Sequence, residues 1–148
     1  VRGAYHEQEI LRAKTKNYPC PVHTLKTKTD TDYNTALETC IKNIARVSIC
    51  AGTHNEKSTQ ILANLMKEYG LNKTDNRIYF SQLLGMSDHI SYNLSEANYN
   101  VSKYVPYGPV KDVMPYLIRR AEENTSIAGQ MGREIINIME EKKRRKNA

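Results

Sequence analysis

The fold of this chain is decided by two short runs, YVPYGPV at residues 104–110 and PYLIRRAEEN at residues 115–124. The first run is typical of a strand end followed by a proline–glycine turn, and the second is typical of a helix. That helix carries two adjacent guanidinium groups, Arg119 and Arg120, soon after the strand-end Tyr104. Because arginine binds carboxylates through two parallel hydrogen bonds, the pattern predicts a site for a small carboxylate. A solvated helix face is the alternative interpretation of such a pair.

Outward from these runs, short apolar segments alternate with segments of helical periodicity. Strands are predicted at residues 47–51, 76–81 and 101–105, with the end of another at residues 1–5. Helices are predicted at residues 7–16, 30–45, 58–69, 88–97, 110–123 and 126–143. The alternation predicts an α/β chain with a parallel sheet, whose loops meet at one edge because the crossovers are right-handed. Alternation alone does not separate an open sheet from part of a barrel, although no glycine-rich phosphate-binding run follows any strand.

The predicted helix at residues 110–123 has two distinct faces. Its apolar residues form one continuous stripe, made of Val110, Val113, Met114, Leu117, Ile118 and Ala121. The polar half holds Tyr116, Arg119, Arg120 and Glu123. Periodicity therefore groups the two arginines with a tyrosine and a carboxylate, but it does not decide which way this half faces.

Composition bounds the class of protein. The chain has 148 residues, 39% of them hydrophobic, a mean hydropathy of -0.66 and no apolar run of membrane-spanning length. The net charge of +6 is concentrated in the run KKRRK at residues 142–146, so the remainder is not a basic platform. A basic module that binds nucleic acid or a membrane surface through this run and the ten tyrosines is one alternative. The tyrosines are not spaced like a base-stacking platform, which disfavours it.

A longer set of motifs resembles the proline dehydrogenase family, in wording closest to mitochondrial animal members. The matching motifs are VRGAY at residues 1–5, PVHT at 21–24, TDTDY at 29–33, THN at 53–55, QLLGM at 82–86 and the block from residue 103 to 124. The resemblance implies a distorted (βα)8 barrel of the TIM type, of which this chain covers strands five to eight and the C-terminal helices. Residues 1–148 would then be the C-terminal portion of a single barrel domain, since a complete barrel takes roughly 250 residues.

The resemblance also implies a reaction. Proline dehydrogenases bind FAD and oxidise L-proline to 1-pyrroline-5-carboxylate in proline catabolism, and they pass the electrons to a quinone. It implies a mitochondrial location with peripheral association with the inner membrane, and no nucleic-acid partner. Half a barrel exposes strand edges and lacks one wall of the flavin site, so the 148-residue chain alone is expected to be inactive.

Eight residues are implied in cofactor binding. They are Arg2, Gly3, His23, Thr24, Leu25, Thr53, His54 and Leu83. The family usually has arginine where this chain has Leu25, which leaves Lys26 as a candidate for that charge. Arg2 as an ordinary strand residue and Leu83 as a core residue are the structural alternatives.

The implied substrate residues lie mainly at the other end of the chain. Arg119 and Arg120 are expected to clamp the carboxylate of proline, and Glu123 is expected to hold their guanidinium groups in place. Tyr104, together with Tyr5, is expected to shape the pocket around the ring. Hydroxyproline dehydrogenase has the same fold and cofactor and is the nearest alternative; its members tend to carry serine at the position of Tyr104.

The cysteines and histidines allow one further interpretation. An odd count of three cysteines without a CxxC motif predicts free thiols. Cys20 and His23, with Cys50 and His54, superficially resemble zinc-binding spacing. Because the flavin pattern already uses both histidines, no metal is predicted.

Overall fold

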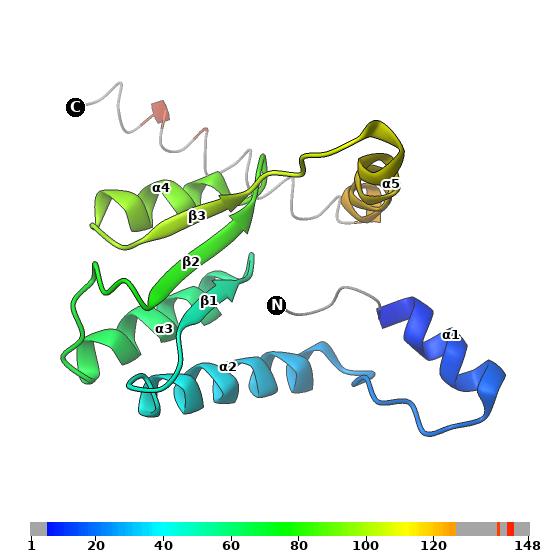
Figure 1. Ribbon diagram of the computed structural model, residues 1–148, viewed down its shortest axis with the longest axis horizontal. Coiled ribbons are helices and arrows are strands. Elements are labelled where there is room, and N and C mark those ends of the chain that lie inside the picture. The colour runs from blue at the N-terminus through cyan, green and yellow to red at the C-terminus, as the bar shows by residue number, and fades with distance from the viewer. Residues whose placement is uncertain (1–5, 127–138, 140–141, 144–148) are drawn as a thin grey trace. The chain divides into compact units, whose positions relative to one another are not determined.

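The computed structural model describes residues 6–126, 139 and 142–143, without the side chains of residues 119 and 121–126 (Figure 1). The chain divides into two units, Val1–Tyr104 and Val105–Ala148. The described helices are α1 (His6–Lys16), α2 (Lys26–Lys42), α3 (Glu56–Glu68), α4 (Asp88–Glu96) and α5 (Val110–Ser126), of which α5 alone lies in the second unit. No helix of the described residues is long and apolar enough to cross a membrane.

Three parallel strands form the sheet of the first unit, in the order β1 (Ile49–Gly52), β2 (Ile78–Leu83) and β3 (Val101–Tyr104). The register pairs Ile49 with Ile78 and Leu83 with Tyr104. Helix α3 connects β1 to β2, and α4 connects β2 to β3 (Figure 1). The predicted alternation of strands and helices with a parallel sheet is confirmed. The strand end predicted at residues 1–5 and most of the helix predicted at residues 126–143 lie outside the described residues.

One face of this sheet is covered by helices and carries the core. The strands contribute Ile49, Ala51, Ile78 and Phe80, and the helices α2, α3 and α4 contribute Leu37, Ile41, Leu62, Met66, Ile90 and Leu94. The aromatic ring of Phe80 packs edge-on against Tyr99, with 5.4 Å between the ring centroids. Because side chains alternate along a strand, the residues between these positions point to the opposite face.

We call that opposite side the open face. It carries Cys50, Gly52, Tyr79, Ser81, Leu83, Ser102 and Tyr104 by strand alternation and register. Cys50, Tyr79 and Tyr104 are exposed there. One row across the three strands is made of the small residues Gly52, Ser81 and Ser102.

Two of these helix starts differ from the sequence predictions. Helix α2 begins at Lys26, because the carbonyl of Leu25 accepts the first turn's N–H groups and Asp30 pairs with Lys26 at 2.6 Å inside the helix. Helix α3 begins at Glu56, where Asn55 caps it by accepting from the backbone N–H of Ser58 at 2.9 Å. Ser87 precedes α4 as predicted, but its side chain makes no capping hydrogen bond.

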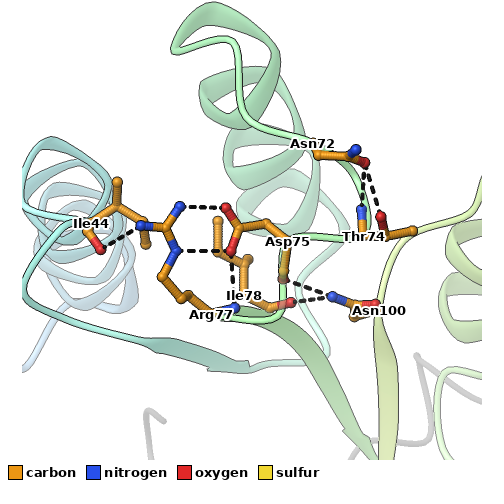
Figure 2. A network of polar contacts seen from close by, with 7 residues as sticks. All are labelled: Ile44, Asn72, Thr74, Asp75, Arg77, Ile78 and Asn100. Carbon is orange, nitrogen blue, oxygen red and sulfur yellow. Dashed lines mark hydrogen bonds and ion pairs between the residues drawn. The ribbon is translucent and has the colours of Figure 1, made fainter.

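Strand β2 begins two residues later than predicted because a polar network takes the residues before it (Figure 2). The guanidinium of Arg77 donates to both carboxylate oxygens of Asp75, at 2.9 and 2.6 Å, and to the carbonyl oxygen of Ile44 at 3.2 Å. The side-chain amide of Asn100 donates to the carbonyl oxygens of Asp75 and Ile78, at 2.7 and 3.1 Å. The hydrogen bonds from Arg77 hold the pKa of Asp75 at about 2, below its ordinary 3.8. This network ties the end of α2 to the starts of β2 and β3, at the edge where the strands begin.

Candidate functional site

The strand ends at the opposite edge bring four of the predicted site residues to one place. Thr53 and His54 follow β1, Leu83 ends β2 and Tyr104 ends β3. The carboxyl ends of parallel strands meet at one edge, which is where α/β proteins place their chemistry. The structure therefore groups residues that are up to about a third of the chain apart in sequence.

The Thr53–His54 pair is held rigidly. Thr53 is buried, and its backbone N–H donates to the carbonyl of Ser81 at 3.1 Å, which continues the sheet past the end of β1. Its hydroxyl accepts from the N–H of Asn55 at 3.1 Å. The half-buried ring of His54 places Nδ1 at 3.0 Å from the hydroxyl of Ser87, in the loop after β2.

A network of hydrogen bonds lies behind this pair, and sequence reasoning missed it. The side-chain amide of Gln82, only 2% exposed, donates to the carbonyl of Thr53 at 3.3 Å. Its oxygen accepts from the hydroxyl of Ser91 at 2.9 Å. The carbonyl of Ser87, 3.4 Å from the same hydroxyl, is an alternative acceptor for its single proton. Since Ser87 contacts His54, the network borders both residues of the pair. The sequence does contain an indication of this network: Gln82 follows Ile78 and Phe80 at intervals of two residues, the spacing that places all three on the same buried face of β2.

Leu83 and Tyr104 lie side by side on the open face. They are register partners, and the backbone N–H of Leu84 donates to the carbonyl of Tyr104 at 3.0 Å. Tyr104 is 52% exposed and Leu83 is half-buried. An apolar side chain and an aromatic ring beside a row of small residues form a surface that suits a flat or ring-shaped ligand. In this unit Leu83 is half-buried and lies outside the hydrophobic core, which is on the other face.

The predicted residues His23, Thr24 and Leu25 lie in the segment between α1 and α2. His23 pairs with the carboxylate of Asp32, and its carbonyl oxygen is 3.1 Å from Nε2 of His6. Leu25 is 58% exposed. Helix α2 runs opposite to the strands, so this segment lies toward the edge where the strands end (Figure 1). Lys26, the candidate for the missing arginine, is engaged with Asp30.

The remaining predicted residues are only partly described. Arg2, Gly3 and Tyr5 lie outside the described residues, as do the side chains of Arg119 and Glu123. In α5, the half-buried Arg120 stands over the ring of Tyr116, with 5.5 Å between Cζ and the ring centroid. The predicted grouping of these two residues on one half of the helix is confirmed.

The described part of the chain contains no group of three or more His, Cys, Asp or Glu side chains that could hold a metal ion. Cys20, Cys40 and Cys50 are free thiols, as their number predicted. Cys50 lies on the open face, whereas Cys40 packs against the core from α2.

Comparison with known proteins gives the chain a family. The proline dehydrogenase family matches residues 1–133. Proline dehydrogenase 1, mitochondrial, of Drosophila melanogaster is 39% identical over 155 residues, covering 98% of this chain and 23% of that protein. The Homo sapiens protein of the same description is 43% identical over 130 residues, covering 86% of this chain and 22% of that protein. Hydroxyproline dehydrogenase of Xenopus laevis is 38% identical over 149 residues, covering 98% and 32%.

A solved structure is similar as well. The crystal structure of proline utilization A (PutA) from Bdellovibrio bacteriovorus inactivated by N-propargylglycine superposes with a TM-score of 0.78 at 28% identity. The match covers 86% of this chain and 13% of that one. The α/β chain with three parallel strands thus corresponds to part of a larger solved protein, and it spans less than a third of each of these relatives.

Proposed function

Because the chain belongs to the proline dehydrogenase family, we propose that residues 1–148 form strands five to eight and the C-terminal helices of one (βα)8 barrel domain. We further propose that the barrel binds FAD and oxidises L-proline to 1-pyrroline-5-carboxylate. The observation that carries the proposal is the meeting of Thr53, His54, Leu83 and Tyr104 at the edge where the parallel strands end. In a barrel of this type, that edge is the one that holds the active site.

The residues at this edge fit a flavin. The small-residue row of Gly52, Ser81 and Ser102 leaves room for a planar ring over the open face. Leu83 supplies an apolar contact beside that row, and His54 and Thr53 supply polar groups at its border. The cofactor, when bound, supplies the hydride acceptor. Arg2, Gly3, His23, Thr24 and Leu25 complete the proposed set of flavin contacts.

The protein's own residues bind and orient the substrate. Arg119 and Arg120 hold the carboxylate of proline, and Glu123 lies one helical turn along α5, where it can fix the two guanidinium groups. Tyr104 and Tyr5 bound the ring. Oxidation removes a hydride from the ring carbon next to nitrogen, and an amine that binds unprotonated needs no general base for this step. The iminium that results then releases its N–H proton to water.

The relatives favour a mitochondrial protein, since those from Drosophila melanogaster and Homo sapiens carry that word in their descriptions. We therefore place the protein in the mitochondrion, peripherally at the inner membrane, with a quinone as electron acceptor. Nucleic acid is not a partner in this proposal. The run KKRRK at residues 142–146 is the feature that a basic binding module would use.

Hydroxyproline dehydrogenase is the second candidate, and the similarity to the Xenopus laevis protein of that description favours it. Tyr104 argues against it. A phenol ring at the position where hydroxyproline-oxidising relatives tend to carry serine leaves neither space nor a partner for a ring hydroxyl. Burial of an unpaired hydroxyl costs roughly 1–3 kcal/mol.

The test is the flavin spectrum of the protein purified at its full natural length. The expected result is a yellow protein that L-proline bleaches under anaerobic conditions and that a quinone restores to yellow. A colourless protein that binds nucleic acid with steep salt dependence refutes the proposal in favour of the basic module.

A chimera isolates the contribution of this chain. In it, the 148 residues replace the matching segment of the Drosophila melanogaster relative. The chimera is expected to bind flavin and to be bleached by L-proline, whereas the 148-residue chain alone is expected to retain no stoichiometric flavin. A soluble monomeric chain that keeps FAD by itself contradicts the half-barrel assignment.

A further inference from the structure

Lys103 makes three polar contacts with the turn between β2 and α4. Its ammonium nitrogen donates to the carbonyl oxygen of Met86 at 2.8 Å and to the carboxylate of Asp88 at 2.7 Å. A third acceptor, the carbonyl oxygen of Leu83, lies 3.4 Å away. We propose that Lys103 is a positioning residue, whose ammonium fills a cation site in the β2–α4 turn and so holds Leu83 and Ser87 in place. Its role in catalysis rests on the proposed function; its role in the turn does not.

The turn needs such support because of its backbone. Gly85 has a φ of +74° and Ser87 a φ of 51°, so a non-glycine residue occupies the left-handed region. Left-handed backbone is unfavourable for residues that carry a Cβ atom. Within this turn the N–H of Met86 donates to the carbonyl of Leu83 at 3.1 Å. The carbonyl oxygens of Leu83 and Met86 both accept from the ammonium.

The acceptors are those of a hard cation. Two carbonyl oxygens and one carboxylate oxygen are ligands typical of an oxygen-liganded metal ion, and an ammonium group has three N–H bonds to offer them. Lys103 also stands near the first turn of α4, where the helix dipole disfavours positive charge. The hydrogen-bond acceptors around the ammonium offset this unfavourable interaction with the helix dipole, and the carboxylate of Asp88 is one of them. A lysine side chain without such acceptors would extend into water.

Strand register explains how one lysine reaches the turn. Lys103 is the register partner of the buried Gln82, so its side chain leaves the sheet on the side of α4. Its neighbour Tyr104 points to the open face beside Leu83. The ammonium thus ties the backbone of Leu83 to the strand that carries Tyr104. The two nearest acceptors of the ammonium, Met86 and Asp88, are the residues before and after Ser87, whose hydroxyl contacts His54.

The test uses Lys103→Ala in the protein at its full natural length. Alanine removes the three side-chain carbons and the nitrogen that propylammonium replaces. The expected result is a loss of about tenfold in kcat/KM for L-proline, the effect of one charge-assisted hydrogen bond. Added propylammonium chloride should restore kcat/KM by at least a third of the loss, measured on a logarithmic scale. Tetramethylammonium chloride has no N–H group and should restore none of the lost kcat/KM.

Amide hydrogen exchange separates the role of Lys103 in the turn from the proposed function, because the measurement requires no enzymatic activity. Exchange at residues 84–88 should accelerate about tenfold in Lys103→Ala, and propylammonium should reverse it, while the amides of α3 stay unchanged. Lys103→Met is the matched control: its side chain fills the space of the lysine stem, so it should show the same local acceleration without rescue. It also decides the question if the alanine variant does not fold.

Unchanged exchange at residues 84–88 in both variants overturns the positioning role. Equal recovery of kcat/KM with propylammonium and with tetramethylammonium overturns the proposal of a cation site. A wild-type protein without proline oxidation, but with the expected exchange results, overturns the proposed function and leaves the role of Lys103 in the turn intact.

Discussion

Replacement of Gln82 by methionine should destabilise the protein without disturbing its core volume. Methionine has a similar length but neither donor nor acceptor of comparable strength, so both hydrogen bonds of the buried amide are lost. The hydroxyl of Ser91 still has the carbonyl of Ser87 within reach at 3.4 Å. The carbonyl of Thr53 loses the side-chain donor that reaches it from β2.

The magnitude follows from the loss of that one donor. Removing one partner of a buried hydrogen bond costs about 1–3 kcal/mol. The 3.3 Å bond that is lost is longer than an ideal N–H···O contact, and the methionine gains some apolar burial. We therefore expect the free energy of unfolding to fall by about 1–2 kcal/mol.

The assay is urea denaturation of the protein at its full natural length, with Gln60→Met as the matched control. Gln60 is an exposed residue of α3, so the same substitution there should change the free energy of unfolding by less than about 0.5 kcal/mol. Gln82→Glu should be worse than Gln82→Met at neutral pH, because it buries an ionised carboxylate against the carbonyl of Thr53. Equal stabilities of Gln82→Met and Gln60→Met would refute the idea that the hydrogen bonds of Gln82 support the Thr53–His54 pair.

Three other predictions concern named side chains. The pKa of Asp75 is about 2 in the folded protein and near 3.8 when unperturbed, so its contribution is complete above about pH 4 and is lost as the pH falls toward 2. Arg77 is 40% exposed, so solvent screening reduces the contribution of the ion pair to the free energy of unfolding to on the order of 1 kcal/mol. In an acid titration, Asp75→Asn should lose stability less steeply over that pH range than the wild type. Arg119→Lys and Arg120→Lys should each raise the KM for L-proline about ten- to a hundredfold with unchanged flavin content. Lysine keeps the positive charge but loses the planar guanidinium that binds a carboxylate through two hydrogen bonds. A wild-type KM in both variants would indicate a solvated helix face. Tyr104→Ser should raise kcat/KM for hydroxyproline relative to proline, and an unchanged ratio with a lowered Tm would show that the ring only packs.

The sequence by itself determined the order of elements and their faces. Strands and helices alternate as predicted, and Leu62 and Met66 are buried on α3 as its periodicity indicated. Both features depend on side-chain spacing along one element, with a period of two in strands and 3.6 in helices. The family resemblance also lay in the order of short motifs, so it needed no structure. These are properties of neighbours in the chain.

Tertiary structure decided which polar groups meet. His54 and Ser87 are 33 residues apart, as are Glu56 and His89, which pair at 2.9 Å. Ser87 stands at the position where a helix cap is expected, but its hydroxyl contacts His54 from a left-handed backbone and does not cap α4. Lys103 gave no signal as a charged residue in a half-buried strand, since its acceptors lie in a turn before α4. Parallel strands bring such groups together only when their connecting helices have packed, so the contacts depend on the packed sheet and not on the local pattern.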